Sequence, residues 1–340
     1  MKIGVIGLGA MGRLHVQEIR KFPYVREILG CDMSAAARAA AKKDFGIDSV
    51  AKEPPLLAWK PDAIFVVTQP STHVAVIEPA LKAGIPVLTE KPLATTIGDC
   101  RRMVALAKRN KTPFQVGFEL RYCGLTRGMR QVVDSGLIGK PLHVDLVQVC
   151  GAHRKGYMTR ERTGGIFWEK LCHQVDFFRY WLGEPQRVMA VAAPNAIKHY
   201  GIEDNVLSCM VFPDGRMGKI TFMSTRAAQI GGTDDHGDRG HYYEMGVTCT
   251  KGSVTYCAWT DTLSVVRFNH RKDCKSELIE RIPATRFGVS CYDVASQNGD
   301  FLERVRAGKP LQFPASDALI SMEWVAKAER SLASGGKWIQ

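Results

Sequence analysis

The sequence predicts an α/β protein in which a doubly wound parallel sheet is followed by a second domain with a largely antiparallel sheet. Three observations predict this arrangement. Short apolar runs alternate with helical patterns up to about residue 119, a glycine-rich turn follows the first of these runs, and strands of alternating polarity dominate after residue 120. A length of 340 residues also favours two domains, which we place at residues 1–119 and 120–340.

The first domain is expected to repeat a strand–helix unit. Such an alternation implies parallel strands with helices on both faces of the sheet, because each helix carries the chain back to the same edge. The expected strands are residues 3–6, 27–31, 63–67, 87–89 and 114–116, and the expected helices are residues 11–21, 34–45, 74–83 and 97–110.

The second domain is expected to combine a sheet with a few helices. Turn sequences such as Pro213-Asp214-Gly215-Arg216 fit hairpins, so the sheet is expected to be mostly antiparallel with one face covered. Residues 229–241, which are rich in Gly, Asp and His, are expected to form a mobile loop. The expected strands lie near 142–150, 187–193, 206–212, 217–224, 243–249, 253–257 and 262–268, and the expected helices near 126–135, 291–307 and 316–333.

The composition is that of a globular protein, with 45% hydrophobic and 24% charged residues. The net charge of +12 is spread along the chain without a basic stripe that carries aromatic residues, so we expect attraction of an anionic cofactor rather than nucleic-acid binding. No apolar run is long enough to cross a bilayer, no signal peptide is evident, and the ten cysteines form no Cys-x-x-Cys pair. We therefore expect a cytoplasmic protein with no membrane segment and no metal site.

The segment Gly7–Gly12 is a G-x-G-x-x-G motif that follows the first strand and opens the first helix. The first glycine permits a tight turn, the second allows close approach of a pyrophosphate, and the third allows the helix to pack on the strand. Asp32 lies 20 residues later, at the end of the second strand, where a carboxylate binds the ribose hydroxyls and repels a 2′-phosphate. The motif therefore predicts NAD rather than NADP. The residues expected to hold it here are Gly7, Gly9, Ala10, Met11, Gly12 and Asp32.

Two polar segments follow later strands at the carboxyl edge of the expected sheet, where open α/β sheets bind ligands. They are Thr68–His73 and Thr89–Leu93. Lys91 lies at the tip of a strand beside Glu90, where its ammonium group can donate to a substrate hydroxyl and favour the alkoxide as hydride leaves. The cofactor-binding residues expected from these segments are Thr68, Gln69, Pro70, His73, Glu90 and Lys91.

A third segment, Gly164–Asp176, carries three titratable side chains at helical spacing. If it is one α-helix, Glu169, His173 and Asp176 lie at i, i+4 and i+7 and share one face. A carboxylate beside an imidazole is the usual arrangement for holding a general base in one tautomer. We therefore expect His173 to be the proton acceptor of the reaction.

Taken together, these segments resemble the Gfo/Idh/MocA oxidoreductases, the family of glucose-fructose oxidoreductase and inositol dehydrogenase. The resemblance spans nearly the whole chain. It implies an N-terminal Rossmann domain and a C-terminal α/β domain with an open, mostly antiparallel sheet that often mediates homodimers or homotetramers. The segments that carry the resemblance are Gly7–Gly12, Thr68–His73, Glu90–Pro92, Arg121-Tyr122, 136–141, Gly164-Gly165 with His173, and 251–253.

The resemblance also implies roles for individual residues. Lys91 matches the family's catalytic lysine and His173 its catalytic histidine, while Arg121 matches a position near the substrate pocket. Four residues before the histidine, many dehydrogenases of the family carry aspartate, whereas this chain carries Glu169. This departure marks a place where the substrate or the reaction can differ.

The leading hypothesis is an NAD-dependent oxidoreductase that moves hydride between a sugar, polyol or sugar-derivative hydroxyl and the nicotinamide. The alternative is an NAD-dependent redox glycosidase. Basic residues such as His153 and Arg154 precede the His173 helix and could bind an anionic glycoside. A non-enzymatic NAD-bound regulator is the third reading. The expected catalytic residues are Lys91, His173 and Glu169, and the expected substrate-binding residues are Lys91, Arg121, Tyr122, His153, Arg154, Trp168, Glu169, His173 and Asp176.

Overall fold

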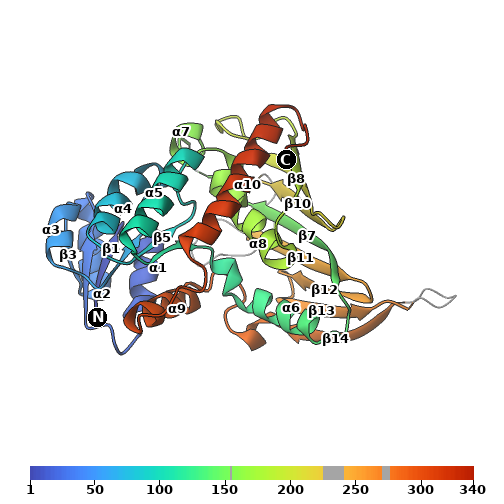
Figure 1. Ribbon diagram of the computed structural model, residues 1–340, viewed down its shortest axis with the longest axis horizontal. Coiled ribbons are helices and arrows are strands. Elements are labelled where there is room, and N and C mark those ends of the chain that lie inside the picture. The colour runs from blue at the N-terminus through green and yellow to red at the C-terminus, as the bar shows by residue number, and fades with distance from the viewer. Residues whose placement is uncertain (154, 225–240, 270–275) are drawn as a thin grey trace. The chain divides into compact units, whose positions relative to one another are not determined.

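The computed structural model describes residues 1–153, 155–224, 241–269 and 276–340 (Figure 1). The described chain divides into two compact units. The domain boundary between residues 119 and 120 stays a prediction. The compact units differ from it in one respect, because the first unit also contains two segments from later in the sequence. The first unit contains Met1–Phe118, Glu161–Gly164 and Val294–Glu323, and the second contains Glu119–Arg160, Gly165–Asp293 and Trp324–Gln340.

Six parallel strands form the sheet of the first unit, in the order β3-β2-β1-β4-β5-β6. The chain begins near the middle of the sheet and builds outwards in both directions, so the strand order reverses between β1 and β4. Open α/β sheets bind ligands at the carboxyl edge beside such a reversal. The strands are β1 (Lys2–Ile6), β2 (Glu27–Cys31), β3 (Asp48–Val50), β4 (Ala63–Val66), β5 (Val87–Glu90) and β6 (Phe114–Gly117).

Helices cover both faces of this sheet, which confirms the predicted doubly wound arrangement. On one face Phe65 of β4 packs edge-on against Phe301 of α9, within a core that α1 and α2 complete. On the other face Leu56 of α3 fills the space over Gly4, and α4 and α5 lie side by side (Figure 1). The helices are α1 (Ala10–Ile19), α2 (Ala35–Phe45), α3 (Glu53–Ala58), α4 (His73–Lys82), α5 (Ile97–Asn110) and α9 (Val294–Arg306).

The second unit contains an eight-stranded sheet in the order β14-β13-β12-β11-β7-β10-β9-β8. Only β7 and β10 pair in parallel among these neighbours, so the predicted antiparallel character is confirmed. The strands are β7 (Pro141–Cys150), β8 (Arg187–Ala192), β9 (Asn205–Val211), β10 (Met217–Met223), β11 (His241–Cys249), β12 (Gly252–Cys257), β13 (Thr262–Arg267) and β14 (Glu277–Pro283).

One face of this sheet is covered by helices. Alternate residues of β10, including Ile220 and Phe222, are fully buried, while their neighbours in the strand are partly exposed. Helix α6 packs on β12 and β13, and α8 packs on β7 and β10 (Figure 1). The remaining α-helices of the described residues are α6 (Gly124–Asp134), α7 (Arg160–Thr163), α8 (Cys172–Leu182) and α10 (Ala315–Ala333), of which α7 and α10 have residues in both units.

Four elements were missed by the sequence analysis, one of which is the four-residue helix α7. Strand β3 has three residues and helix α3 six, so neither offers a full period of apolar positions. Strand β14 is exposed at all but one position and therefore lacks the alternation of a half-buried strand. The predicted mobile loop falls outside the described residues over 229–240, and its last residue, His241, instead begins β11. No helix in the described part of the chain is long and apolar enough to cross a membrane.

Candidate active site

The glycine turn after β1 has the shape that a dinucleotide phosphate requires. Gly7 has a φ of +98°, and a Cβ atom there would lie 2.5 Å from the carbonyl oxygen of Val67. A Cβ atom on Gly12 would collide with the carbonyl oxygen of Gly7. A Cβ atom on Gly9 would meet no atom within 4 Å, and no side chain caps the N-terminus of α1 at this residue. The turn is therefore closed on its inner side and open at Gly9, which fits a pyrophosphate approaching the helix N-terminus.

Asp32 is held beside this turn by backbone hydrogen bonds. The N–H of Leu8 donates to Oδ2 over 2.8 Å, and the N–H of Ser34 donates to Oδ1 over 2.8 Å. Arg38 of α2 donates from Nη1 to the Asp32 carbonyl oxygen over 2.7 Å. The carboxylate thus has a defined position at the end of β2, next to the glycine turn. Gly7, Gly9, Gly12 and Asp32 fit NAD, and Ala10 and Met11 follow Gly9 in the first turn of α1.

The loop after β4 is connected to the loop after β5 through His73. This side chain is fully buried, with Nε2 lying 3.2 Å from the Thr68 carbonyl oxygen and Nδ1 lying 3.2 Å from the Leu93 carbonyl oxygen. Burial lowers the pKa of His73 despite these two carbonyl contacts, which act in the opposite direction. His73 therefore contacts both predicted ligand-binding loops from a fully buried position.

Gln69 and Pro70 lie in the sequence between Thr68 and His73. Gln69 directly precedes the 3₁₀ turn Pro70–Thr72, which leads into α4. Arg162, which belongs to the same compact unit, donates from Nη2 to Gln69 Oε1 over 2.7 Å. A segment far along the sequence thus contributes to the cofactor loop of the first unit. The sequence analysis did not predict this contact, because the closeness of Arg162 to Gln69 depends on the fold.

Glu90 is buried at the end of β5 and is surrounded by polar groups. Its Oε1 lies 3.0 Å from Nε2 of His15, and its Oε2 accepts the backbone N–H of Lys91 over 3.3 Å. The other ring nitrogen of His15 lies 3.1 Å from Oδ1 of Asn298. Sequence reasoning placed Glu90 and Lys91 together but missed His15 and Asn298, since Asn298 lies on α9, far from the glycine motif in sequence.

In the second unit, His173 has a carboxylate neighbour that the sequence analysis missed. Oε1 of Glu119 lies 3.4 Å from Nε2 of His173, and both side chains are buried. Glu119 belongs to a short 3₁₀ helix, Glu119–Arg121, directly after β6. No sequence spacing could have paired these residues, because they come from different elements.

The prediction of one continuous α-helix through Glu169 and His173 is wrong. Residues Phe167–Leu171 form a π-helix, and α8 begins only at Cys172. Such π turns inside helices occur frequently at functional sites. Glu169 lies within the π-helix, where its Oε1 accepts the hydroxyl of Tyr157 over 3.1 Å. Trp168, beside it, is 5% exposed.

The turn that leads into the π-helix is held by Glu329 of α10. Gly165 has a φ of +136°, and a Cβ atom there would collide with the Glu329 carboxylate. Glu329 Oε1 accepts the N–H of Phe167 over 2.8 Å, and Oε2 pairs with Arg160 at 3.0 Å. Burial raises the pKa of Glu329, although the Phe167 N–H and Arg160 favour its charged form. This contact positions the start of the segment that carries Glu169 and His173.

His153 is connected to Glu169 through Tyr157. Its ring stacks on Tyr157 with a centroid separation of 5.0 Å and an interplanar angle of 18°. Its backbone N–H donates to the hydroxyl of Tyr200 over 2.6 Å. His153, Tyr157 and Glu169 are therefore consecutive members of one contact chain, of which Tyr157 was not predicted. Arg154, which was predicted beside His153, lies outside the described residues.

Arg121 and Asp176 bind one another. Nε of Arg121 donates to Oδ2 of Asp176 over 2.7 Å, and Nη2 donates to Oδ1 over 2.6 Å, with the two side chains 6% and 2% exposed. A bidentate buried pair of this kind satisfies the carboxylate and holds the guanidinium in one plane. Tyr122, next to Arg121, is also buried.

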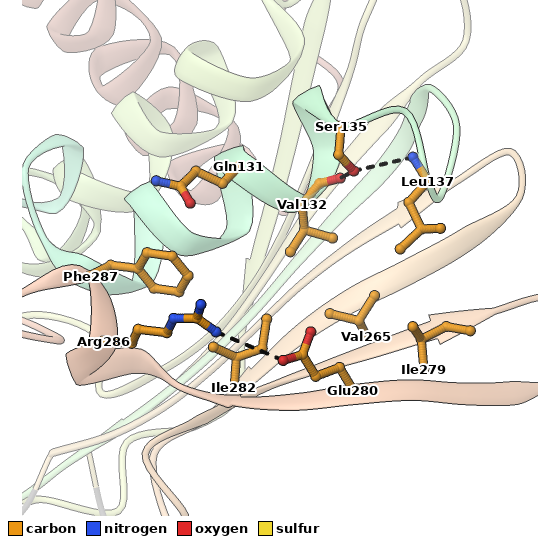
Figure 2. Close-up of a pocket in the computed structure, with 10 residues that line it drawn as sticks. All are labelled: Gln131, Val132, Ser135, Leu137, Val265, Ile279, Glu280, Ile282, Arg286 and Phe287. Carbon is orange, nitrogen blue, oxygen red and sulfur yellow. Dashed lines mark hydrogen bonds and ion pairs between the residues drawn. The ribbon is translucent and has the colours of Figure 1, made fainter.

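A pocket of about 270 Å³ lies elsewhere in the second unit, between α6 and strands β13 and β14 (Figure 2). Its walls include Val132, Ile282 and Phe287, and Arg286 faces Glu280 at 3.9 Å on one side. None of the predicted site residues lines it. Within the described ranges, no three His, Cys, Asp or Glu side chains are grouped so as to hold a metal ion.

Known proteins resemble this chain over both parts of the sequence. Residues 1–118 match the family model described as "Oxidoreductase family, NAD-binding Rossmann fold", and residues 126–255 match the "GFO/IDH/MocA C-terminal domain". The inositol 2-dehydrogenase/D-chiro-inositol 3-dehydrogenase of Lacticaseibacillus casei is 30% identical over 229 residues. That match covers 65% of this chain and 65% of the relative, so the chain aligns with slightly less than two thirds of it.

Two solved structures share the fold across the whole chain. An oxidoreductase from Agrobacterium radiobacter, solved with NAD⁺, L-tartaric acid and magnesium, has a TM-score of 0.82 at 18% identity and covers 100% of this chain and 98% of its own. Levoglucosan dehydrogenase, solved with NADH, gives the same values. The first family model also confirms the predicted NAD cofactor. With both family models matched in order along one chain, the protein belongs to the Gfo/Idh/MocA oxidoreductase family and carries its NAD-binding Rossmann domain.

Proposed function

We propose that this protein is an NAD-dependent dehydrogenase that transfers hydride between the nicotinamide and a hydroxyl-bearing carbon of a sugar, polyol or sugar derivative. The observation that carries the proposal is the position of Lys91 immediately after β5, beside the buried Glu90 and in the same unit as the glycine turn and Asp32. When bound, NAD supplies the hydride acceptor. The residues of the chain supply binding, orientation and proton handling.

For the cofactor, we propose that the open backbone at Gly9 and the first turn of α1 bind the pyrophosphate, and that Asp32 binds the adenosine ribose. Thr68, Gln69, Pro70, His73 and Glu90 complete the proposed cofactor set at the ends of β4 and β5. An acidic side chain fixed by the N–H groups of Leu8 and Ser34 disfavours a 2′-phosphate, which supports NAD over NADP.

For the proton, we propose that His173 is the general base and Lys91 the electrophilic partner. The Glu119 carboxylate, whose Oε1 lies 3.4 Å from Nε2 of His173, can only accept, so it favours a proton on Nε2 and leaves the lone pair on Nδ1. Nδ1 is buried in this structure, so the proposal requires it to become accessible as substrate binds, where it accepts the hydroxyl proton of the substrate. The ammonium of Lys91 stabilises the negative charge that develops on the substrate oxygen.

For the substrate, the similarity to inositol dehydrogenases and to levoglucosan dehydrogenase favours a ring with several hydroxyl groups. We propose that Glu169, with its carboxylate held by Tyr157, and His153 bind such hydroxyls, with Arg154, Tyr122 and Trp168 as further candidates. We assign Arg121 and Asp176 to a supporting pair, because their charged groups bind one another. A cytoplasmic homodimer or homotetramer remains our expectation for the assembled protein.

The proposal is tested by incubating the protein with NAD and a panel of inositols, neutral sugars, uronates and aryl glycosides. We expect one NADH per molecule of oxidised product on at least one polyol or sugar, and none with the variant Lys91→Met. Release of an aglycone without net NADH would contradict the dehydrogenase and indicate a redox glycosidase. NAD binding without turnover of any compound would contradict enzymatic activity.

A further inference from the structure

A buried polar cluster lies behind Lys91, entirely within the first unit. His15 of α1 is fully buried and contacts the Glu90 carboxylate through Nε2 at 3.0 Å. Asn298 of α9, also fully buried, contacts Nδ1 of the same ring at 3.1 Å. The opposite oxygen of Glu90 accepts the backbone N–H of Lys91 at 3.3 Å. Three segments far apart in sequence therefore converge on one carboxylate that adjoins Lys91.

The hydrogen-bond chemistry of the cluster defines where its protons lie. An ionised carboxylate only accepts, so Nε2 of His15 must donate to Glu90, whichever way the Asn298 amide is turned. Burial alone would raise the pKa of Glu90, but the hydrogen bond and charge of His15, together with Lys91, lower it overall. Glu90 is thus an anion in a buried place, and His15 is the side chain that donates to it.

The surroundings leave Glu90 little freedom to move. A Cβ atom on Gly117 of β6 would lie 2.9 Å from Glu90 Oε1, so a larger residue at that position would displace the carboxylate. The side chains that act on Glu90 electrostatically are His15 of α1, His73 of α4 and Lys91 beside it, whereas α9 and β6 present the uncharged Asn298, Gln297 and Gly117. The negative charge beside Lys91 is therefore fixed in position, and His15 is its main partner.

We propose that His15 is a positioning residue for Lys91. By donating to Glu90, it holds a carboxylate at the base of Lys91, and that charge favours the protonated form of the lysine side chain. Asn298 orients the His15 ring from the other side. The inference rests on the proposed function only in regarding Lys91 as catalytic, because the geometry of the cluster involves no substrate.

The test measures the reactivity of Lys91 itself, without substrate or NAD. The rate at which an amine-reactive reagent acylates Lys91 is recorded by mass spectrometry as a function of pH, since only the neutral amine reacts. In Glu90→Gln the midpoint is expected to fall by about one pH unit, because a favourable charge is lost. In His15→Leu it is expected to fall in the same direction by a smaller amount, and His15→Gln, which keeps a donor, is expected to restore most of it.

A double variant separates an effect through Glu90 from a general loosening of the fold. If His15 acts through Glu90, His15→Leu adds no further shift in a Glu90→Gln background. Val16→Ala, a buried core change on the same helix, is the matched control and is expected to leave the midpoint unchanged. If His15→Leu fails to fold, the pH midpoint of Lys91 acylation is measured in Asn298→Ala instead, and a smaller shift in the same direction is expected.

An unchanged midpoint in the folded His15 and Asn298 variants, or additive shifts in the double variant, would overturn the proposal. The same variants are then assayed for turnover with the best substrate of the panel. Absence of any turnover by the unmodified protein would count against the proposed dehydrogenase while leaving the Lys91 reactivity result standing. Normal turnover with no shift in Lys91 reactivity would count against His15 alone.

Discussion

Oε1 of Glu119 lies 3.4 Å from Nε2 of His173, and the two residues come from different elements of the second unit. This pairing gives the proposed general base a carboxylate partner outside its own helix. It also changes the role expected for Glu169, whose carboxylate is engaged by the hydroxyl of Tyr157. The proton-handling residue and the proposed hydroxyl-binding carboxylate are thus separate groups.

Replacing Glu119 by Gln is expected to lower kcat by about 100-fold or more, with a smaller change in KM. The amide can present a donor to Nε2, which moves the ring proton to Nδ1 and removes the lone pair that accepts the substrate proton. Steady-state kinetics of Glu119→Gln and Glu119→Asp would measure the effect. Glu280→Gln changes an exposed carboxylate of β14 and serves as the control. Equal kcat values for all three variants would exclude Glu119 from the reaction.

Replacing Asp32 by Ser is expected to change the cofactor preference. The loss of the charged acceptor lowers kcat/KM for NAD by about 10- to 100-fold, and the loss of repulsion raises it for NADP. Comparison of both cofactors with one substrate would measure the shift. Asp44→Ser, which removes a surface aspartate paired with Arg13, is the matched control. An unaltered ratio of kcat/KM for NAD to kcat/KM for NADP in Asp32→Ser would show that the Asp32 carboxylate does not bind the ribose.

Replacing Gly165 by Ala is expected to destabilise the protein by about 3–5 kcal/mol, because a positive φ and a collision with Glu329 act together. Gly215 has a φ of +83° but open space around it, so Gly215→Ala isolates the backbone cost of about 1–2 kcal/mol. Urea unfolding of both variants would give the difference. Equal destabilisation of Gly165→Ala and Gly215→Ala would mean that the Glu329 side chain moves aside without a free-energy cost.

The buried His73 is expected to make stability depend on pH. Its pKa in the folded protein is lowered below the ordinary histidine value of 6.5, so the unfolded chain binds its proton more readily. The resulting loss of stability is absent above about pH 6.5 and grows as pH falls towards the folded pKa. In His73→Gln, unfolding free energies at pH 5.5 and 7.5 should differ less than in the unmodified protein. An equal or greater difference would contradict the burial of a neutral His73.

Most of the fold was predictable because its signals are local. The glycine turn and apolar runs placed β1, α1 and the strand ends within a few residues, and helix α5 was predicted with its observed bounds, Ile97–Asn110. Strand β14 was missed because its exposed positions carry no alternation. Lys91 could be predicted at a strand end because that position follows from the order of elements.

The partners of the site residues could not be predicted, because they depend on long-range packing. His15 meets Asn298 across 283 positions, and Arg121 meets Asp176 across 55. The π-helix at Phe167–Leu171 also has no signal in the apolar pattern, which fits an α-helix equally well. The sequence therefore predicted the candidate residues, while the fold determined which of them bind one another.

We propose that Lys91 acts in hydride transfer and not merely in folding or cofactor binding. The most direct test is the single-turnover rate of NADH formation in Lys91→Met, measured at saturating NAD with the substrate found in the panel. We expect a rate at least about 100-fold below that of the unmodified protein, with NAD affinity changed only slightly. A rate equal to that of the unmodified protein in the folded, NAD-binding variant would contradict it.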